Sequence, residues 1–127
     1  MTDAAIDRNL ALEAVRVTES AAMAALAYLG GGDERAADEA AVKAMMNRLG
    51  TLILDGTVRM GEGEEGEVED LYTGQTIGTG GAPKADVAVL ALEGKSIIAR
   101  GGYNALSVIA LAEDGGFMSV PNIYMEK

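Results

Sequence analysis

In the stretch Asp55–Glu65, a short apolar run ends in glycines that alternate with carboxylates, which are potential ligands of a cation. Gly61 and Gly63 would let the backbone take positive φ or approach a ligand closely. Glu62 and Glu64 would supply the hard oxygen donors that a divalent cation prefers. The stretch therefore indicates a cation site or, as is commoner for acidic glycine-rich loops, a solvated turn.

Further carboxylates flank this stretch on both sides. Asp38 falls in the first turn of a predicted helix, where the helix dipole alone would favour an acidic residue. Glu93 follows a strongly apolar run and precedes Gly94, a place where layered sheets often carry a site. The segment 62–70 has six carboxylates in nine residues, and we assign a role to one or two of them at most, because such runs are usually solvated.

The chain begins with helical patterns. Apolar residues recur every three or four positions through Ala4–Leu29, which predicts one long amphipathic helix with Thr2 or Asp3 as its N-cap. Three glycines at 30–32 should end it, because glycine is costly inside a helix and readily forms a left-handed cap.

A second helix is predicted over Arg35–Leu49. Asp33 should be its N-cap, and Gly50 should close it. One line of apolar residues, Ala37, Ala41, Met45 and Leu49, marks the face that it should bury.

The remainder of the chain is predicted to form strands. Thr51–Leu54 and Thr57–Met60 are expected to form a hairpin around an Asp-Gly turn. Leu71–Thr73 and Thr76–Ile77 are short strand candidates. A glycine-containing loop at 78–84 separates them from the next predicted strand.

Asp86–Leu92 should be a central buried strand, because it is apolar on both faces after its first residue. Ala105–Ala112 and Phe117–Val120 should form a last hairpin around the turn at 114–116. The predicted fold class is α/β of the layered α+β kind, with two N-terminal helices followed by a mostly antiparallel or mixed sheet.

Length and charge narrow the function classes. The 127 residues predict one domain, 1–127. The net charge of −10 repels nucleic acid and anionic lipid, so neither is an expected partner. No apolar run approaches the roughly 20 residues that span a bilayer. The N-terminus has no targeting signal, and we expect a cytoplasmic protein.

Taken in order, the motifs of the chain resemble those of class II fructose-1,6-bisphosphatases, bacterial sugar phosphatases. The matching segments are Val17–Ala22, Ala37–Asp38, Ala40–Val42, Asp55–Val58, Gly61–Glu64, Leu71–Tyr72, Gly78–Gly80, Asp86–Val89, Glu93–Gly94, Asn104–Leu106 and Tyr124–Lys127.

The resemblance implies a layered sugar-phosphatase fold and a role in gluconeogenesis, where such enzymes hydrolyse the 1-phosphate of fructose 1,6-bisphosphate with Mg²⁺ or Mn²⁺. Metal ions in a carboxylate cage neutralise the phosphate and activate water. Carried over by position, the metal ligands would be Asp38, Glu62 and Glu93, and Tyr124 would contact the sugar phosphate.

The departures from the family pattern fall on this machinery. Where the family has D-P-[IL]-E-G-T, this chain has Leu90 in place of the bridging aspartate and Lys95 in place of the threonine that positions water. Each change makes the site more positive by one unit, which opposes cation binding. The resemblance therefore implies a weakened Mg²⁺ or Mn²⁺ site and no intact catalytic set. The family chain is also more than twice as long.

Three functions remain open. The first is a non-catalytic relative that acts by self-association or by docking to a full-length phosphatase homologue, with a homo-oligomer expected. The second is a fructose-1,6-bisphosphatase that is active only when assembled. The third is a module that binds a divalent cation or a sugar phosphate without turnover. In the first case Lys95 could replace the metal by lying among Glu62, Glu93 and Asp38, or it could simply point to water.

Overall fold

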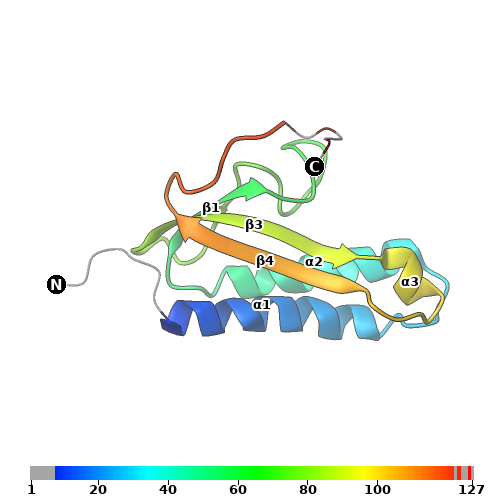
Figure 1. The fold of residues 1–127 in the computed structure, drawn as a ribbon. Helices are drawn as coiled ribbons and strands as arrows, with labels where there is room; N and C mark the ends of the chain where they lie inside the picture. The colour runs from blue at the N-terminus through cyan, green and yellow to red at the C-terminus, as the bar shows by residue number, and fades with distance from the viewer. Residues whose placement is uncertain (1–7, 122, 124–125, 127) are drawn as a thin grey trace.

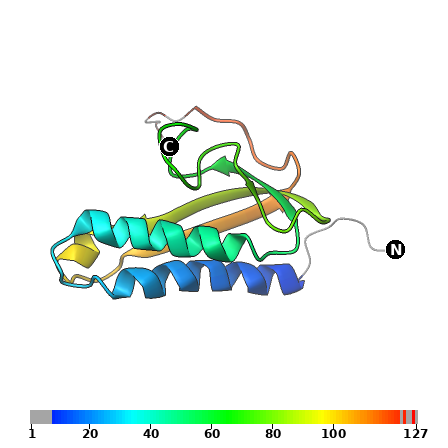
Figure 2. The ribbon, with the colours of Figure 1, turned by 180° about the vertical axis from the view of Figure 1, so that it is seen from behind.

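The computed structural model describes residues 8–121, 123 and 126. Its two long helices, α1 (Arg8–Leu26) and α2 (Glu34–Leu49), lie side by side under one face of a sheet, as Figures 1 and 2 show from opposite sides. The predicted N-cap of the first helix, Thr2 or Asp3, lies outside the described residues.

Local signals define the helix boundaries. α1 ends three residues before the predicted Leu29, and the chain turns through the glycines, where the Gly30 and Gly32 N–H groups donate to Ile98 and Ala99 carbonyls, both at 2.8 Å. Asp33 is the N-cap of α2, as predicted, because its Oδ1 accepts from the Ala36 N–H at 3.0 Å.

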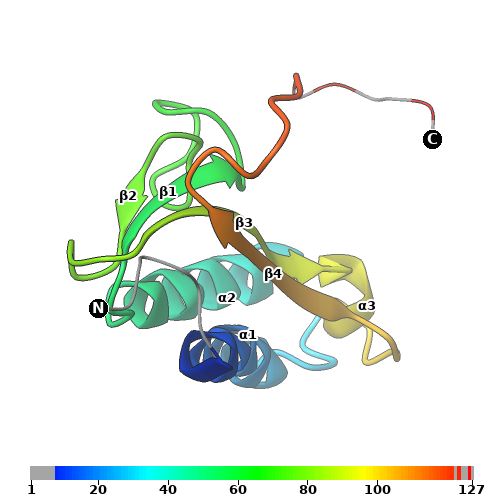
Figure 3. The same cartoon turned by 60° about the vertical axis from the view of Figure 1, so that its left-hand side comes forward.

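The sheet is mixed and has four strands in the order β2-β1-β3-β4 (Figure 3). These strands are β1 (Asp55–Met60), β2 (Thr76–Ile77), β3 (Lys84–Glu93) and β4 (Leu106–Glu113). β1 and β3 are parallel, and the other pairs are antiparallel. The predicted fold class is confirmed, and so is the central position of the strand that contains Asp86–Leu92.

The first predicted hairpin is wrong. Asp55 and Gly56 belong to β1 and form no turn, and residues 51–54 are irregular. Gly56 serves packing instead, because a Cβ there would meet Ile77 Cδ1 at 2.5 Å and Leu54 Cδ1 at 2.7 Å. The Asp-Gly pair therefore marks a strand that must approach its neighbours closely.

The last predicted hairpin is also wrong. The chain turns at 114–116 as expected, but residues 117–120 join no strand and leave the sheet. A short helix that the sequence did not indicate, α3 (Lys95–Ala99), follows β3. Gly94 starts it with φ of 101°, a left-handed conformation that favours glycine.

One core fills the space between the helices and the sheet. The predicted apolar line of the second helix is fully buried there, and it meets Val17 and Ala21 of α1 and Val58, Val87 and Val89 of the sheet. Small alanines at the helix contact let α1 and α2 pack closely. Within the described residues, no helix is both long and apolar enough to cross a membrane.

Candidate functional site

Glu62 is the acidic residue of the glycine-rich loop that the fold fixes in place. It lies just beyond the end of β1, where its Oε1 accepts from the Ala91 N–H of β3 at 2.8 Å. Burial raises the pKa of Glu62 above its usual value, and the nearby Asp38 carboxylate also raises it. The Ala91 N–H and the Lys95 ammonium act in the opposite direction.

A β-bulge arranges the end of β3. Leu90 pairs with Val108 and Glu93 pairs with Leu106, so three steps along β3 match two steps along β4. Directly paired residues point to the same face of a sheet, and Val108 and Leu106 share a face because they are two residues apart. The bulge therefore places Leu90 and Glu93 on one face, although their odd spacing would put them on opposite faces of a regular strand.

Asp38 approaches the same region from α2. Asp38 and Glu62 both line a groove of about 590 Å³, together with Arg35 and Lys43 of α2 and with the acidic loop. Glu93 is exposed and is not among the residues that line this groove. Two of the three predicted ligands therefore line one groove, and Glu93 is not part of that lining.

The side chains that could donate ligand atoms do not by themselves form a binding site for a metal ion. Among the residues that the structure describes, no three Asp, Glu, His or Cys side chains are grouped so that they could hold a metal ion. Metal binding by Asp38, Glu62 and Glu93 stays a prediction. The predicted contact of Tyr124 with a sugar phosphate lies outside the described residues.

Lys95 is exposed at the start of α3 and forms no ion pair in the described part of the chain. The Lys95 ammonium interacts with Glu62 electrostatically, without a hydrogen bond or ion pair. This arrangement agrees with the solvent-facing alternative. The idea that its ammonium pairs directly with the three carboxylates has no contact to support it.

The glycines of the loop serve packing. Neither Gly61 nor Gly63 has positive φ, contrary to the first role suggested for them. A Cβ on Gly61 would overlap the carbonyl oxygen of Leu71, and one on Gly63 would lie 2.9 Å from the Glu67 carboxylate. Gly61 and Gly63 therefore permit close approach of the following loop of the same chain, which contains Glu67 and Leu71.

Asp86 is a buried carboxylate to which the sequence patterns assigned no role. It is only 2% exposed, its Oδ1 accepts from Arg59 Nε at 3.0 Å, and its Oδ2 accepts from the Gly115 N–H at 3.0 Å. Arg59 also lies 3.9 Å from Asp114. The carboxylate ties β1, β3 and the turn after β4 together. Its position as a lone charge in an apolar run was the available signal.

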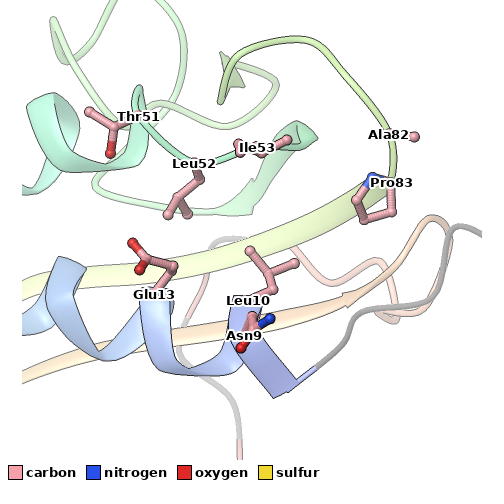
Figure 4. A pocket seen from close by; sticks show the side chains of 8 residues that line it. All are labelled: Asn9, Leu10, Glu13, Thr51, Leu52, Ile53, Ala82 and Pro83. Carbon is pink, nitrogen blue, oxygen red and sulfur yellow. The ribbon is translucent and has the colours of Figure 1, made fainter.

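A separate cavity of about 410 Å³ lies between the start of α1 and the loops at 51–53 and 82–83 (Figure 4). Leu10, Leu52, Ile53 and Pro83 line it, together with the polar residues Asn9, Glu13 and Thr51. None of the predicted ligands lines this cavity, so we do not assign it to the site.

Replacing Glu62 with glutamine should raise stability at neutral pH. A carboxyl whose folded pKa is raised contributes stability that is complete below its unfolded value of 4.5 and is lost as pH rises through the folded pKa. Glutamine keeps an acceptor for the Ala91 N–H and removes this loss. The gain at pH 7 should be below about 1 kcal/mol, because solvent screens a half-buried group.

Urea unfolding at several pH values would measure this effect. The advantage of Glu62→Gln over the parent chain should grow between pH 4 and pH 7. Glu64→Gln, at an exposed position of the same loop, is the matched control and should show no such trend. An advantage that stays constant with pH would contradict the assignment of the raised pKa to Glu62.

Comparison with known proteins places this sequence in a family. Residues 8–127 match the family described as bacterial fructose-1,6-bisphosphatase, glpX-encoded. The chain is 48% identical over 120 residues to fructose-1,6-bisphosphatase 1 class 2 of Escherichia coli strain K12, which is 94% of this chain and 36% of the relative. It is 43% identical over 122 residues to fructose-1,6-bisphosphatase class 2 of Haemophilus influenzae, or 96% of this chain and 37% of the relative.

The chain therefore spans just over a third of the length of the curated relatives that it matches. The matched part includes both long helices, the whole sheet and every predicted site residue. With this match across nearly all of its length, the chain belongs to the glpX-encoded bacterial fructose-1,6-bisphosphatase family.

Proposed function

We propose that this chain is a non-catalytic relative of the class II fructose-1,6-bisphosphatases that acts by associating with a second protein chain. The sequence comparison shows that the chain belongs to the same family as these relatives. The non-catalytic role and the association are our proposals for the chain by itself.

The observation that carries the proposal is which side chains occupy the carboxyl-terminal end of β3. The bulge directs positions 90 and 93 to one face, the arrangement that a shared cation site would need, yet one of the two side chains is Leu90. An apolar side chain supplies no oxygen ligand for a cation. Lys95 adds a positive charge, which interacts electrostatically with Glu62. Glu62, the best-placed carboxylate, already accepts a backbone hydrogen bond.

Phosphate release from fructose 1,6-bisphosphate tests the proposal. The assay uses the purified chain with Mn²⁺ at several protein concentrations, and we expect no release above the protein-free rate at any of them. Release that grows faster than linearly with protein concentration would instead support the alternative that the chain is a phosphatase active only when assembled.

Binding without turnover is the second candidate function. It is favoured by one observation, the groove that Asp38 and Glu62 share, because two carboxylates can hold a cation weakly. Calorimetric titration with Mn²⁺ separates the two functions. Heat of binding that disappears in Asp38→Asn would favour the binding module, and absence of heat would favour association alone.

A further inference from the structure

The register between β1 and β3 shifts by one residue near the end of β1. Val58 pairs with Val87, but the next pair is Met60 with Ala88, so β1 advances two residues while β3 advances one. Arg59 is the extra residue of this β1 bulge. The burial of β1 agrees with the shift, because Met60 is 39% exposed although Val58, two residues earlier, is fully buried. Bulges often lie beside functional sites, where they change the direction of a side chain or end the pairing.

The β1 bulge determines where Glu62 lies along β3. In the register of the earlier pairs, Glu62 and Ala91 would be directly opposite each other. Counted from the last pair, which contains Ala88, Glu62 is two residues further on and Ala91 is three. The backbone of Glu62 is therefore held back by one residue, roughly 3.3 Å along the strand. The side chain spans this distance, and its Oε1 accepts from the Ala91 N–H at 2.8 Å.

Asp86 holds the extra residue of the β1 bulge. The Arg59 side chain reaches back toward the start of β3, and its Nε donates to Asp86 Oδ1 at 3.0 Å. The strand partner of Asp86 is Thr57, two residues before Arg59. Asp86 is itself fixed, since its Oδ2 accepts from the Gly115 N–H at 3.0 Å and only 2% of the residue is exposed. A buried carboxylate without its guanidinium partner is costly, so the pair stabilises the position that Arg59 has in the bulge.

We propose that Arg59 and Asp86 are positioning residues for Glu62. Their ion pair holds the extra residue of the β1 bulge, and the bulge stops Glu62 where its carboxylate, rather than its backbone, meets the Ala91 N–H. Ala91 adjoins Leu90 near the carboxyl-terminal end of β3, so the pair determines which part of the candidate site the Glu62 carboxylate reaches. Every contact lies within one chain, and this role is therefore independent of the proposed association.

The chemical shift of the Ala91 amide proton tests this role in the 127-residue chain, because the shift reports on the hydrogen-bond acceptor and not on global stability. Glu62→Ala removes the acceptor and gives the reference shift. Arg59→Met removes the ion pair and keeps a long side chain at a position that is 46% exposed. We expect the Ala91 resonance of Arg59→Met to move toward the reference by about half of the difference or more, since the N–H loses a charged acceptor in both variants.

Hydrogen exchange gives a second readout on the same samples. The Ala91 amide of Arg59→Met should exchange at least about tenfold faster than in the parent chain, measured relative to the amide of Val87. Val87 lies between Val58 of β1 and Leu111 of β4, so its rate corrects for a general loosening of the sheet.

Three further variants complete the design. Arg16→Met is the matched control, because it makes the same change in charge and breaks an exposed pair on α1, Arg16 with Glu13 at 3.7 Å. It should leave the Ala91 resonance unchanged. Arg59→Lys keeps a cation within reach of Asp86 and should retain most of the parent shift. Should Arg59→Met fail to fold because Asp86 is left buried and unpaired, Arg59→Met combined with Asp86→Asn removes that charge and carries the same expectation.

Two results would overturn the positioning role. An Ala91 resonance that stays in place in Arg59→Met, or exchange that rises equally at Ala91 and Val87, would mean that the ion pair only stabilises the sheet. Equal movement of the resonance in Arg16→Met and Arg59→Met would mean that net charge is the cause. Phosphate release tests the proposed function separately, and its outcome does not depend on any of these shifts.

Discussion

Replacing Gly61 with alanine should destabilise the fold by at least about 3 kcal/mol. The new methyl group would overlap the backbone carbonyl oxygen of Leu71 and would lie 2.9 Å from Val58 Cγ1. A backbone atom cannot move aside as the end of a flexible side chain can. The loop would have to open, which would break the hydrogen bond from the Glu62 N–H to the Leu71 oxygen, now 2.8 Å long.

Leu71 has little freedom to yield. Its side chain is fully buried, its φ is 59°, and its N–H donates to Gln75 Oε1 at 2.6 Å. Displacing it would open a cavity in the core as well as break contacts. The expected result is a large fall in the urea midpoint of unfolding.

Gly81→Ala is the control for this prediction. A Cβ on Gly81 would have no atom within 4 Å, and its φ lies outside the left-handed region. It should change stability by less than about 0.5 kcal/mol, or raise it slightly by restricting the unfolded chain. Equal stabilities of the Gly61 and Gly81 variants would mean that the loop opens without cost and that the packing role of Gly61 is wrong.

Features that depend on neighbouring residues were predictable from the sequence. The boundaries of α2 follow from Asp33 and Gly50, which act on the first and last turn of the same helix. The buried line from Ala37 to Leu49 follows from helical periodicity. The central position of β3 follows from a run too apolar for a strand with a solvated face.

The errors concern residues whose roles are set by distant segments. An Asp-Gly pair is a strong local turn signal, but at 55–56 it is overridden by β2 and β3, which pair with β1 on both sides. The turn at 114–116 leads away from the sheet, where Asp86 holds the Gly115 N–H from 29 residues earlier. Local propensity carries no information on such contacts.

The choice of site residues came from the sequence and stays a prediction, whereas the geometry around them could not be predicted. Position in the family motifs pointed to Asp38, Glu62 and Glu93. The bulge that turns Glu93 to the face of Leu90 arises from the pairing of β3 with β4, and the bond from Ala91 to Glu62 joins residues 29 apart. Neither leaves a mark in the sequence near the residues concerned.

Restoring the two residues that depart from the family pattern, Leu90→Asp together with Lys95→Thr, should create measurable Mn²⁺ affinity. Leu90 adjoins Ala91, whose N–H holds the Glu62 carboxylate, and the bulge places Glu93 on the same face as Leu90. The substitutions add an oxygen ligand there and remove a positive charge. The change of two charge units should strengthen Mn²⁺ binding at least about tenfold for each position.

Titration calorimetry of the parent chain, each single variant and the double variant would measure this gain. Ile53→Asp with Lys84→Thr is the matched control, because it makes the same change in net charge at exposed positions away from the site. A similar gain in the control would mean that overall charge, not local geometry, sets the affinity. No gain in the double variant would show that the carboxylates do not converge even with the family residues in place. The cause of the lost cation site would then be the arrangement of β3 and the loop rather than the side chains of Leu90 and Lys95.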